Sequence, residues 1–131
     1  MRNKPTDYNL FEIYEQNYIS LKKLTVSLTA LNMKCVYIID HAKVSFKVVE
    51  FTKYTAVIEI QFPNWYDSVY TNIMISSIKV RLYHDAKMAS VELDFRTYPP
   101  QKQFTEKLNL NLFLREYLIL CSHKGKLSFT C

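Results

Sequence analysis

The chain opens with a helical pattern of apolar residues and then changes to a strand pattern. Asp7 can cap a helix whose apolar positions recur at steps of three and four residues as far as Leu24. Its opposite side is polar, which is typical of a surface helix lying on a core. From Cys35 the period becomes two, and β-branched and aromatic residues predominate, as in pleated strands. This pattern predicts strands near Cys35–Asp40, Lys43–Phe51, Thr55–Phe62, Ile73–Tyr83 and Met88–Phe95.

Side-chain alternation also predicts how the first three strands pair. In the first hairpin, apolar residues of the two strands face each other if Ile39 lies opposite Val44. In the second hairpin, a two-residue turn would mix apolar and charged residues on each face. A three-residue loop at 52–54 instead sets Val48 opposite Ile58. We therefore expect an odd-length, bulged connection there.

The last hairpin is the most strand-like part of the chain. Residues 63–72 before it contain turn formers and predict an irregular loop. In the hairpin itself, Val80 opposes Val91 when residues 84–87 form a four-residue loop. A shorter primed turn is disfavoured because Ala86 would resist a positive φ.

A second helix is predicted from Thr105 to about Lys124, with Gly125 as its C′ residue. It is apolar on more than one narrow stripe, so it either lies centrally against the sheet or shares a face with a partner, and the first interpretation is favoured. The element order predicts an α+β fold: a five-stranded antiparallel meander sheet with the N-terminal and C-terminal helices packed on one face. With 131 residues, 49% of them hydrophobic, we expect a single domain spanning 1–131.

Composition excludes several common function classes. The only glycine is Gly125, so Walker loops, dinucleotide fingerprints and Gly-x-Ser-x-Gly elbows are absent. The net charge of +5 comes from basic residues scattered among acids, so nucleic acid is a weaker candidate partner than a protein or a small anionic ligand. Cys121 and His123 are two residues apart on a predicted helix and point away from each other. We expect no metal site and no cofactor.

The cysteines bear on cellular location. There are three, Cys35, Cys121 and Cys131, and this odd, widely spaced set argues against a secreted disulfide framework. The first residues lack a continuous apolar stretch, and no run approaches the roughly 18 apolar residues of a membrane span. We expect a cytoplasmic protein that does not enter the membrane; its oligomeric state is left open.

A meander places alternate turns at the same end of its sheet, so the second and last hairpin loops should lie together. The candidate binding residues at that end are Glu50, Thr52, Lys53, Tyr54, Arg81, Tyr83, His84 and Asp85. Exposed turn residues with local hydrogen bonds would produce the same pattern. The leading hypothesis is a non-enzymatic binding or adaptor domain. The alternative is a small enzyme acting on a phosphorylated or nucleotide substrate, in which His84 and Asp85 transfer protons while Arg81 and Lys53 hold the anion.

Several stretches resemble one protein family. The most specific is the run Val80-Arg81-Leu82-Tyr83-His84-Asp85-Ala86, followed by Ala89 and Val91. The others are Glu50 with residues 52–55, then Glu15, Asn17, Tyr18 and residues 21–24, and, near the end, Asn111, Phe113, Leu114, Tyr117, Leu118, Cys121 and Gly125. These stretches span nearly the whole chain and, taken from its start to its end, resemble the YqiB-like bacterial family (domain of unknown function 1249). The resemblance implies no established activity, cofactor or catalytic residue.

Overall fold

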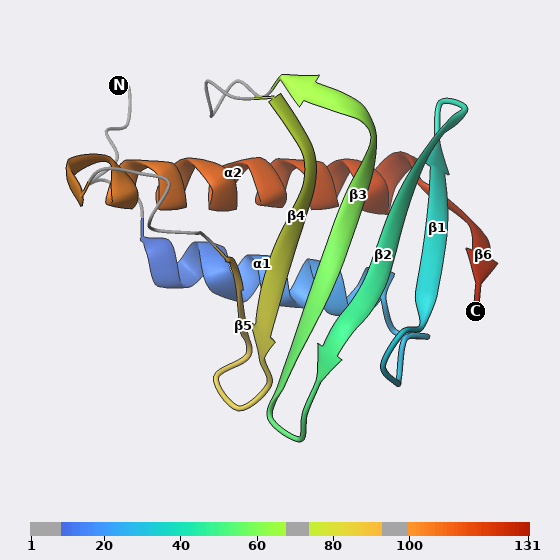
Figure 1. Ribbon diagram of the computed structural model, residues 1–131, viewed down its shortest axis with the longest axis horizontal. Coiled ribbons are helices and arrows are strands. Elements are labelled where there is room, and N and C mark those ends of the chain that lie inside the picture. Colours follow the sequence, from blue (N-terminus) through green and yellow to red (C-terminus); the bar gives the residue numbers. More distant parts are fainter. Residues whose placement is uncertain (1–8, 68–73, 93–99) are drawn as a thin grey trace.

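The computed structural model describes residues 9–67, 74–92 and 100–131. Figure 1 shows an antiparallel sheet with helices lying across one of its faces. The elements are α1 (Leu10–Leu24), β1 (Lys34–Ile39), β2 (Ala42–Phe51), β3 (Thr55–Asp67), β4 (Met74–Tyr83), β5 (Met88–Val91), α2 (Pro100–Lys124) and β6 (Lys126–Thr130). The strand order is β5-β4-β3-β2-β1-β6. The predicted α+β class is confirmed, and the described residues form six strands rather than five.

The additional strand is β6, which follows α2 and pairs with β1. Cys35 lies opposite Thr130 in this antiparallel pair. Reciprocal backbone hydrogen bonds of 2.9 and 2.8 Å join Lys34 and Cys131. The α2 helix therefore carries the chain from β5, at one edge of the sheet, to the opposite edge (Figure 1).

The predicted pairing of β1 with β2 is wrong by two residues. Ile39 lies opposite Ala42 rather than Val44. The reason is the turn, in which Asp40 and His41 both have positive φ, 49° and 70°, as a two-residue primed turn requires. Since a shift of two keeps every side chain on its original face, the apolar residues still point into the core.

The predicted pairing of β2 with β3 is confirmed, with Val48 opposite Ile58. Residues 52–54 separate the two strands, as expected. The irregularity lies within β2, between Val48 and Glu50, where the register shifts by one residue. This bulge changes which face of the sheet the end of β2 presents.

The last hairpin also has the predicted register, with Val80 opposite Val91. The loop at 84–87 has four residues, and its positive φ falls on Lys87 rather than Ala86. The predicted irregular loop is wrong for residues 63–67, which continue β3. The rest of that loop, Ile73 and the predicted end of the hairpin beyond Glu92 lie outside the described residues.

Both helices begin at residues other than those predicted. The N-cap of α1 is Asn9, whose side-chain oxygen accepts a hydrogen bond of 3.3 Å from the Glu12 amide. Asp7 lies outside the described residues. The α2 helix begins at Pro100 rather than Thr105, and a proline is tolerated in a first turn because no intrahelical partner awaits its missing N–H.

Gly125 directly follows α2, but not in the left-handed conformation that a C′ glycine usually adopts. Its amide donates a 2.9 Å hydrogen bond to the Cys121 carbonyl. A Cβ on Gly125 would lie 2.6 Å from that oxygen. The glycine is thus required by a close backbone approach where the chain leaves α2 for β6.

The core lies between the two helices and one face of the sheet. Alternate strand residues are buried there, and residues of α1 and α2 pack on them. The principal strand residues are Val44, Phe46, Val48, Ile58, Ile60, Val80, Leu82, Ala89 and Val91. On the other face, Lys47 lies opposite Glu59, which lies opposite Lys79. That open face is therefore a ladder of complementary charges.

A buried pair of asparagines joins both helices to the edge strand β5. The Asn111 side-chain oxygen accepts a 3.0 Å hydrogen bond from the Val91 amide, and its nitrogen donates to the Lys107 carbonyl at 2.7 Å. The Asn17 side chain donates to the Asn111 carbonyl at 3.2 Å. Asn17 and Asn111 are 1% and 0% exposed. This network fixes α1, α2 and β5 relative to one another.

Asn111→Ala is expected to lower the free energy of unfolding by about 2 kcal/mol, because it leaves the buried Val91 amide without a partner. Urea denaturation monitored by circular dichroism measures this change. Gln61→Ala, on the open face of β3, is the control and should change stability by less than about 0.5 kcal/mol. Equal effects of the two substitutions would show that the network contributes no special stability.

Lys87→Gly is expected to stabilise the protein. Lys87 has φ 56°, and the left-handed conformation costs a non-glycine residue about 1–2 kcal/mol. The flexibility of glycine in the unfolded chain offsets about 0.5–1 kcal/mol of this. A net gain of about 0.5–1 kcal/mol should appear in urea denaturation, and a loss of stability would contradict the stated loop conformation.

Candidate functional site

Two loops that are distant in sequence meet at one end of the sheet, as predicted. The β2–β3 and β4–β5 loops lie side by side in Figure 1. The His84 amide donates a 2.9 Å hydrogen bond to the Tyr54 carbonyl, and Thr55 lies opposite Tyr83 in the β3–β4 pair. We call this region, residues 51–55 and 83–87, the loop end.

Arg81 lies on the open face of the sheet, because its neighbours Val80 and Leu82 are buried beneath the helices. Its guanidinium group is 2.7 Å from Glu50 and forms two hydrogen bonds to Glu92, of 3.2 and 3.3 Å. The hydrogen bond to Glu92 is the main cause that raises the pKa of Arg81. Glu50 and Arg81, both candidate binding residues, therefore form an ion pair with each other.

His84 lies on the helix side of the sheet. Its Nδ1 is 3.0 Å from the Tyr18 hydroxyl oxygen, and the two rings meet edge-on with centroids 5.9 Å apart. Burial and the positive charge of Lys22 lower the pKa of His84, while Asp85 acts in the opposite direction. These surroundings favour the neutral form of the imidazole, which contacts α1 through Tyr18.

The remaining candidate residues form the tip of the loop end. Thr52 is structural, because its hydroxyl oxygen accepts the Thr55 amide at 3.0 Å and pairs with the Thr55 hydroxyl at 2.8 Å. The Lys53 ammonium lies 5.2 Å from the centroid of the Tyr54 ring. Tyr54 and Tyr83 are both exposed. The tip therefore presents a lysine and two phenols to solvent.

The sheet separates the groups that the enzyme hypothesis combined. Arg81 and Glu50 are paired on the open face, whereas His84 contacts Tyr18 on the helix side. A small cavity of about 170 Å³ lies beside His84, and its described lining includes neither Arg81 nor Lys53. The structure therefore does not bring the proposed proton-transfer and anion-holding groups to one place.

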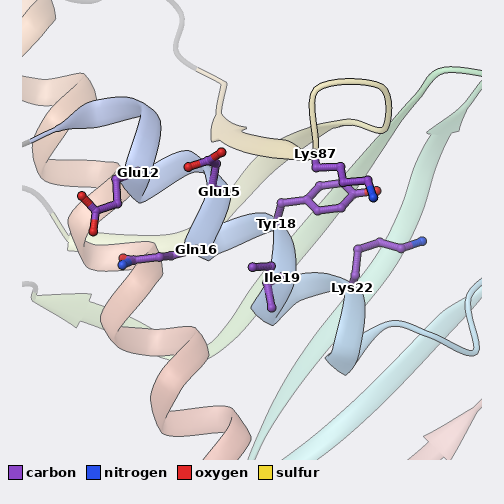
Figure 2. A pocket seen from close by; sticks show the side chains of 7 residues that line it. All are labelled: Glu12, Glu15, Gln16, Tyr18, Ile19, Lys22 and Lys87. Carbon is purple, nitrogen blue, oxygen red and sulfur yellow. The ribbon is translucent and has the colours of Figure 1, made fainter.

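A larger groove of about 660 Å³ runs along α1 (Figure 2). Near the loop end it is lined by Tyr18, Ile19, Lys22 and Lys87, and nearer the start of α1 by Glu12 and Glu15. In the sequence, Tyr18 falls on the apolar period of the first helix, and Lys87 falls in the four-residue loop predicted at 84–87. The sequence signal for this groove is the spacing of Tyr18 and Lys22, since residues four apart lie on one side of a helix.

The two buried cysteines, Cys35 and Cys121, lack the surroundings of reactive thiols. Burial raises the pKa of Cys35 to about 11 and of Cys121 to about 12, so both are protonated at neutral pH. Within residues 9–67, 74–92 and 100–131, no three metal-ligating side chains gather at one point. In the same ranges, neither helix is both long and apolar enough to cross a membrane.

Comparison with known proteins agrees with the sequence resemblance. A family model described as "Protein of unknown function (DUF1249)" matches residues 20–127. The chain belongs to this family. It is 29% identical to "Uncharacterized protein YqiB" of Escherichia coli strain K12 over 137 residues, covering 97% of this chain and 96% of that protein. The proteins of that name from strains O6:H1 and O157:H7 match equally. No solved structure matches significantly.

The residues that carried the resemblance have contrasting roles in the structure. Asn17 and Asn111 belong to the buried network that joins the helices to β5. Gly125 closes the end of α2. Tyr18 and His84 come from separate motifs but form one hydrogen bond at the surface. Tyr18 lines the groove along α1, and His84 lines the small cavity beside it.

His84 should make stability depend on pH. Its pKa in the folded protein is lowered from 6.5, so its contribution is present above about pH 6.5 and is lost as the pH falls through the folded pKa. His84→Gln is expected to reduce the drop in melting temperature between about pH 7.5 and about pH 5. Differential scanning fluorimetry measures this, with His123→Gln as the control. An unchanged drop in His84→Gln would contradict the assignment.

Proposed function

We propose that this protein is a non-enzymatic binding or adaptor domain that acts in the cytoplasm and contacts a protein partner through its loop end. The observation that carries the proposal is the exposure of large aromatic side chains there. Phe51, Tyr54 and Tyr83 are 47%, 53% and 42% exposed. Exposed aromatic residues supply contact area at low entropic cost and are enriched at protein interfaces.

The charges of the loop end also favour recognition of a partner. Lys53 lies beside the Tyr54 ring, an arrangement that offers a cation and a flat apolar surface together. The backbone beneath these side chains is held by the hydrogen bond from His84 to Tyr54 and by the Thr52–Thr55 turn. A fixed backbone reduces the entropy that binding must overcome. The loop end is thus a preorganised surface.

The separation of the ionisable groups supports binding over catalysis. General acid–base chemistry needs its groups within hydrogen-bonding reach of one substrate. Arg81 is held by Glu50 and Glu92 on the open face, and His84 is held by Tyr18 on the other side. A substrate anion on Arg81 would have to displace two carboxylates.

The free cysteines support the proposed location. Cys35 and Cys121 are buried free thiols, and Cys131 is an exposed one. An exposed thiol persists in a reducing compartment, whereas oxidising compartments favour its conversion to a disulfide.

Site-specific photo-crosslinking in the native host tests the proposal. A benzophenone amino acid replaces Tyr83 in one variant and Phe129, exposed on β6 at the opposite edge of the sheet, in the control. A discrete protein adduct is expected from position 83 and not from 129. Adding Tyr54→Ala should reduce the yield of that adduct about tenfold, as for an aromatic residue central to an interface.

Two outcomes would contradict the proposed binding surface. One is the absence of any adduct from position 83 at native expression. The other is an identical set of adducts from positions 83 and 129, which would indicate random collision rather than a defined partner. Mass spectrometry of the excised adduct identifies the partner and the residue that it contributes.

A further inference from the structure

The groove along α1 has opposite charges at its two ends. Figure 2 shows the Lys22 and Lys87 side chains near the hydroxyl end of Tyr18, with Glu12 and Glu15 further back along the helix. Lys22 comes from the last turn of α1 and Lys87 from the β4–β5 loop. Two ammonium groups from separate elements therefore flank one phenol.

Lys87 occupies a backbone position that favours a different residue. Its φ of 56° lies in the left-handed region, where glycine or asparagine is normally preferred. A lysine at this position bears a conformational cost and places a charge at the groove. A costly residue at a surface groove is a structural indication of a functional role.

Because Tyr18 contacts His84, the hydrogen bond that Tyr18 can offer in the groove depends on the protonation of His84. When His84 is neutral and protonated at Nε2, the Tyr18 hydroxyl donates to Nδ1 across 3.0 Å, so only oxygen lone pairs face the groove. When Nδ1 takes up a proton from solvent, it donates to the Tyr18 oxygen instead. The phenolic hydrogen is then free to donate to an acceptor in the groove.

We propose that the end of this groove between Lys22 and Lys87 binds a small oxyanion of the phosphate class, which accepts a hydrogen bond from Tyr18 once His84 is protonated. Two ammonium groups match the charge of a dianion better than that of a single carboxylate. One proton enters from solvent for each anion bound through this exchange. The site shares Lys87 and His84 with the loop end but lies on the helix side of it, and it does not depend on the protein-binding role proposed above.

The charged groups around His84 determine whether anion binding raises or lowers its pKa. From α1, Lys22 lowers the pKa of His84, and from the β4–β5 loop Asp85 raises it. The cavity beside His84 is lined on the β2 and β3 side by Phe51, Ala56 and Ile58, which do not titrate. A bound anion would oppose the effect of the lysines and so raise the pKa of His84.

The acidic end of the groove limits the size of the ligand. Glu12 and Glu15 line the groove together with Lys22 and Lys87, so its charged lining is balanced. A long polyanion lying along the groove would meet the two carboxylates. The arrangement therefore suits a compact anion at the lysine end, rather than a nucleic-acid backbone.

Proton NMR titration of the full chain tests the anion site, with sulfate as the probe because it stays a dianion across the range. The chain has three histidines, so His41 and His123 serve as internal controls. At equal ionic strength, replacing chloride by sulfate is expected to raise the pKa of His84 by about 0.5 or more. His41 and His123 should show no comparable change, and acetate should have a smaller effect than sulfate.

Variants of Lys22 and Lys87 distinguish anion binding at a defined site from nonspecific screening of charges by salt. Lys22→Gln and Lys87→Gly should each abolish the excess effect of sulfate over chloride, whereas Lys87→Arg should retain it. Since Lys87→Gly is expected to fold more stably, its loss of response would not reflect unfolding. The proposal is overturned if sulfate acts no more strongly than chloride on His84, or if Lys87→Gly keeps the full response.

Discussion

The hydrogen bond from the Val91 amide to the Asn111 side chain is the contact on which the position of β5 depends. β5 is a four-residue strand at the edge of the sheet, and its Val91 amide bonds to α2 rather than to a strand. A buried amide without an acceptor lowers the free energy of unfolding by more than a typical surface contact raises it. The Asn111 side chain supplies the acceptor that a neighbouring strand would otherwise supply. Asn17 joins α1 to the same network by donating to the Asn111 carbonyl.

This constraint also determines what the loop end presents. With β5 and α1 held together, the hairpin tip brings His84 to Tyr18 on the helix side, while Arg81, three residues earlier, stays with its two carboxylates on the open face. Neighbouring residues of one motif thus serve opposite sides of the sheet. We propose that the solvent-facing tip contacts a partner and that the helix side binds a small anion.

The sequence predicted the features that depend on local alternation. The pairing of Val80 with Val91 follows from apolar residues that must all face one side. Residues 126–130 were missed because β6 is short and exposed along its length, so it has no buried periodicity to detect. The contact between Tyr18 and His84 depends on how α1 crosses the sheet, a tertiary relation that no local pattern contains.

Native-state hydrogen exchange of the Val91 amide measures whether Asn111 secures this edge of the sheet. If the hydrogen bond to Asn111 holds β5, the Val91 amide should exchange within about tenfold of the slowest amides of β2 and β3, which open only on global unfolding. Exchange as fast as that of the exposed edge strand β6 would contradict it. In that case β5 and the loop end would open locally, and the asparagine network would not hold them.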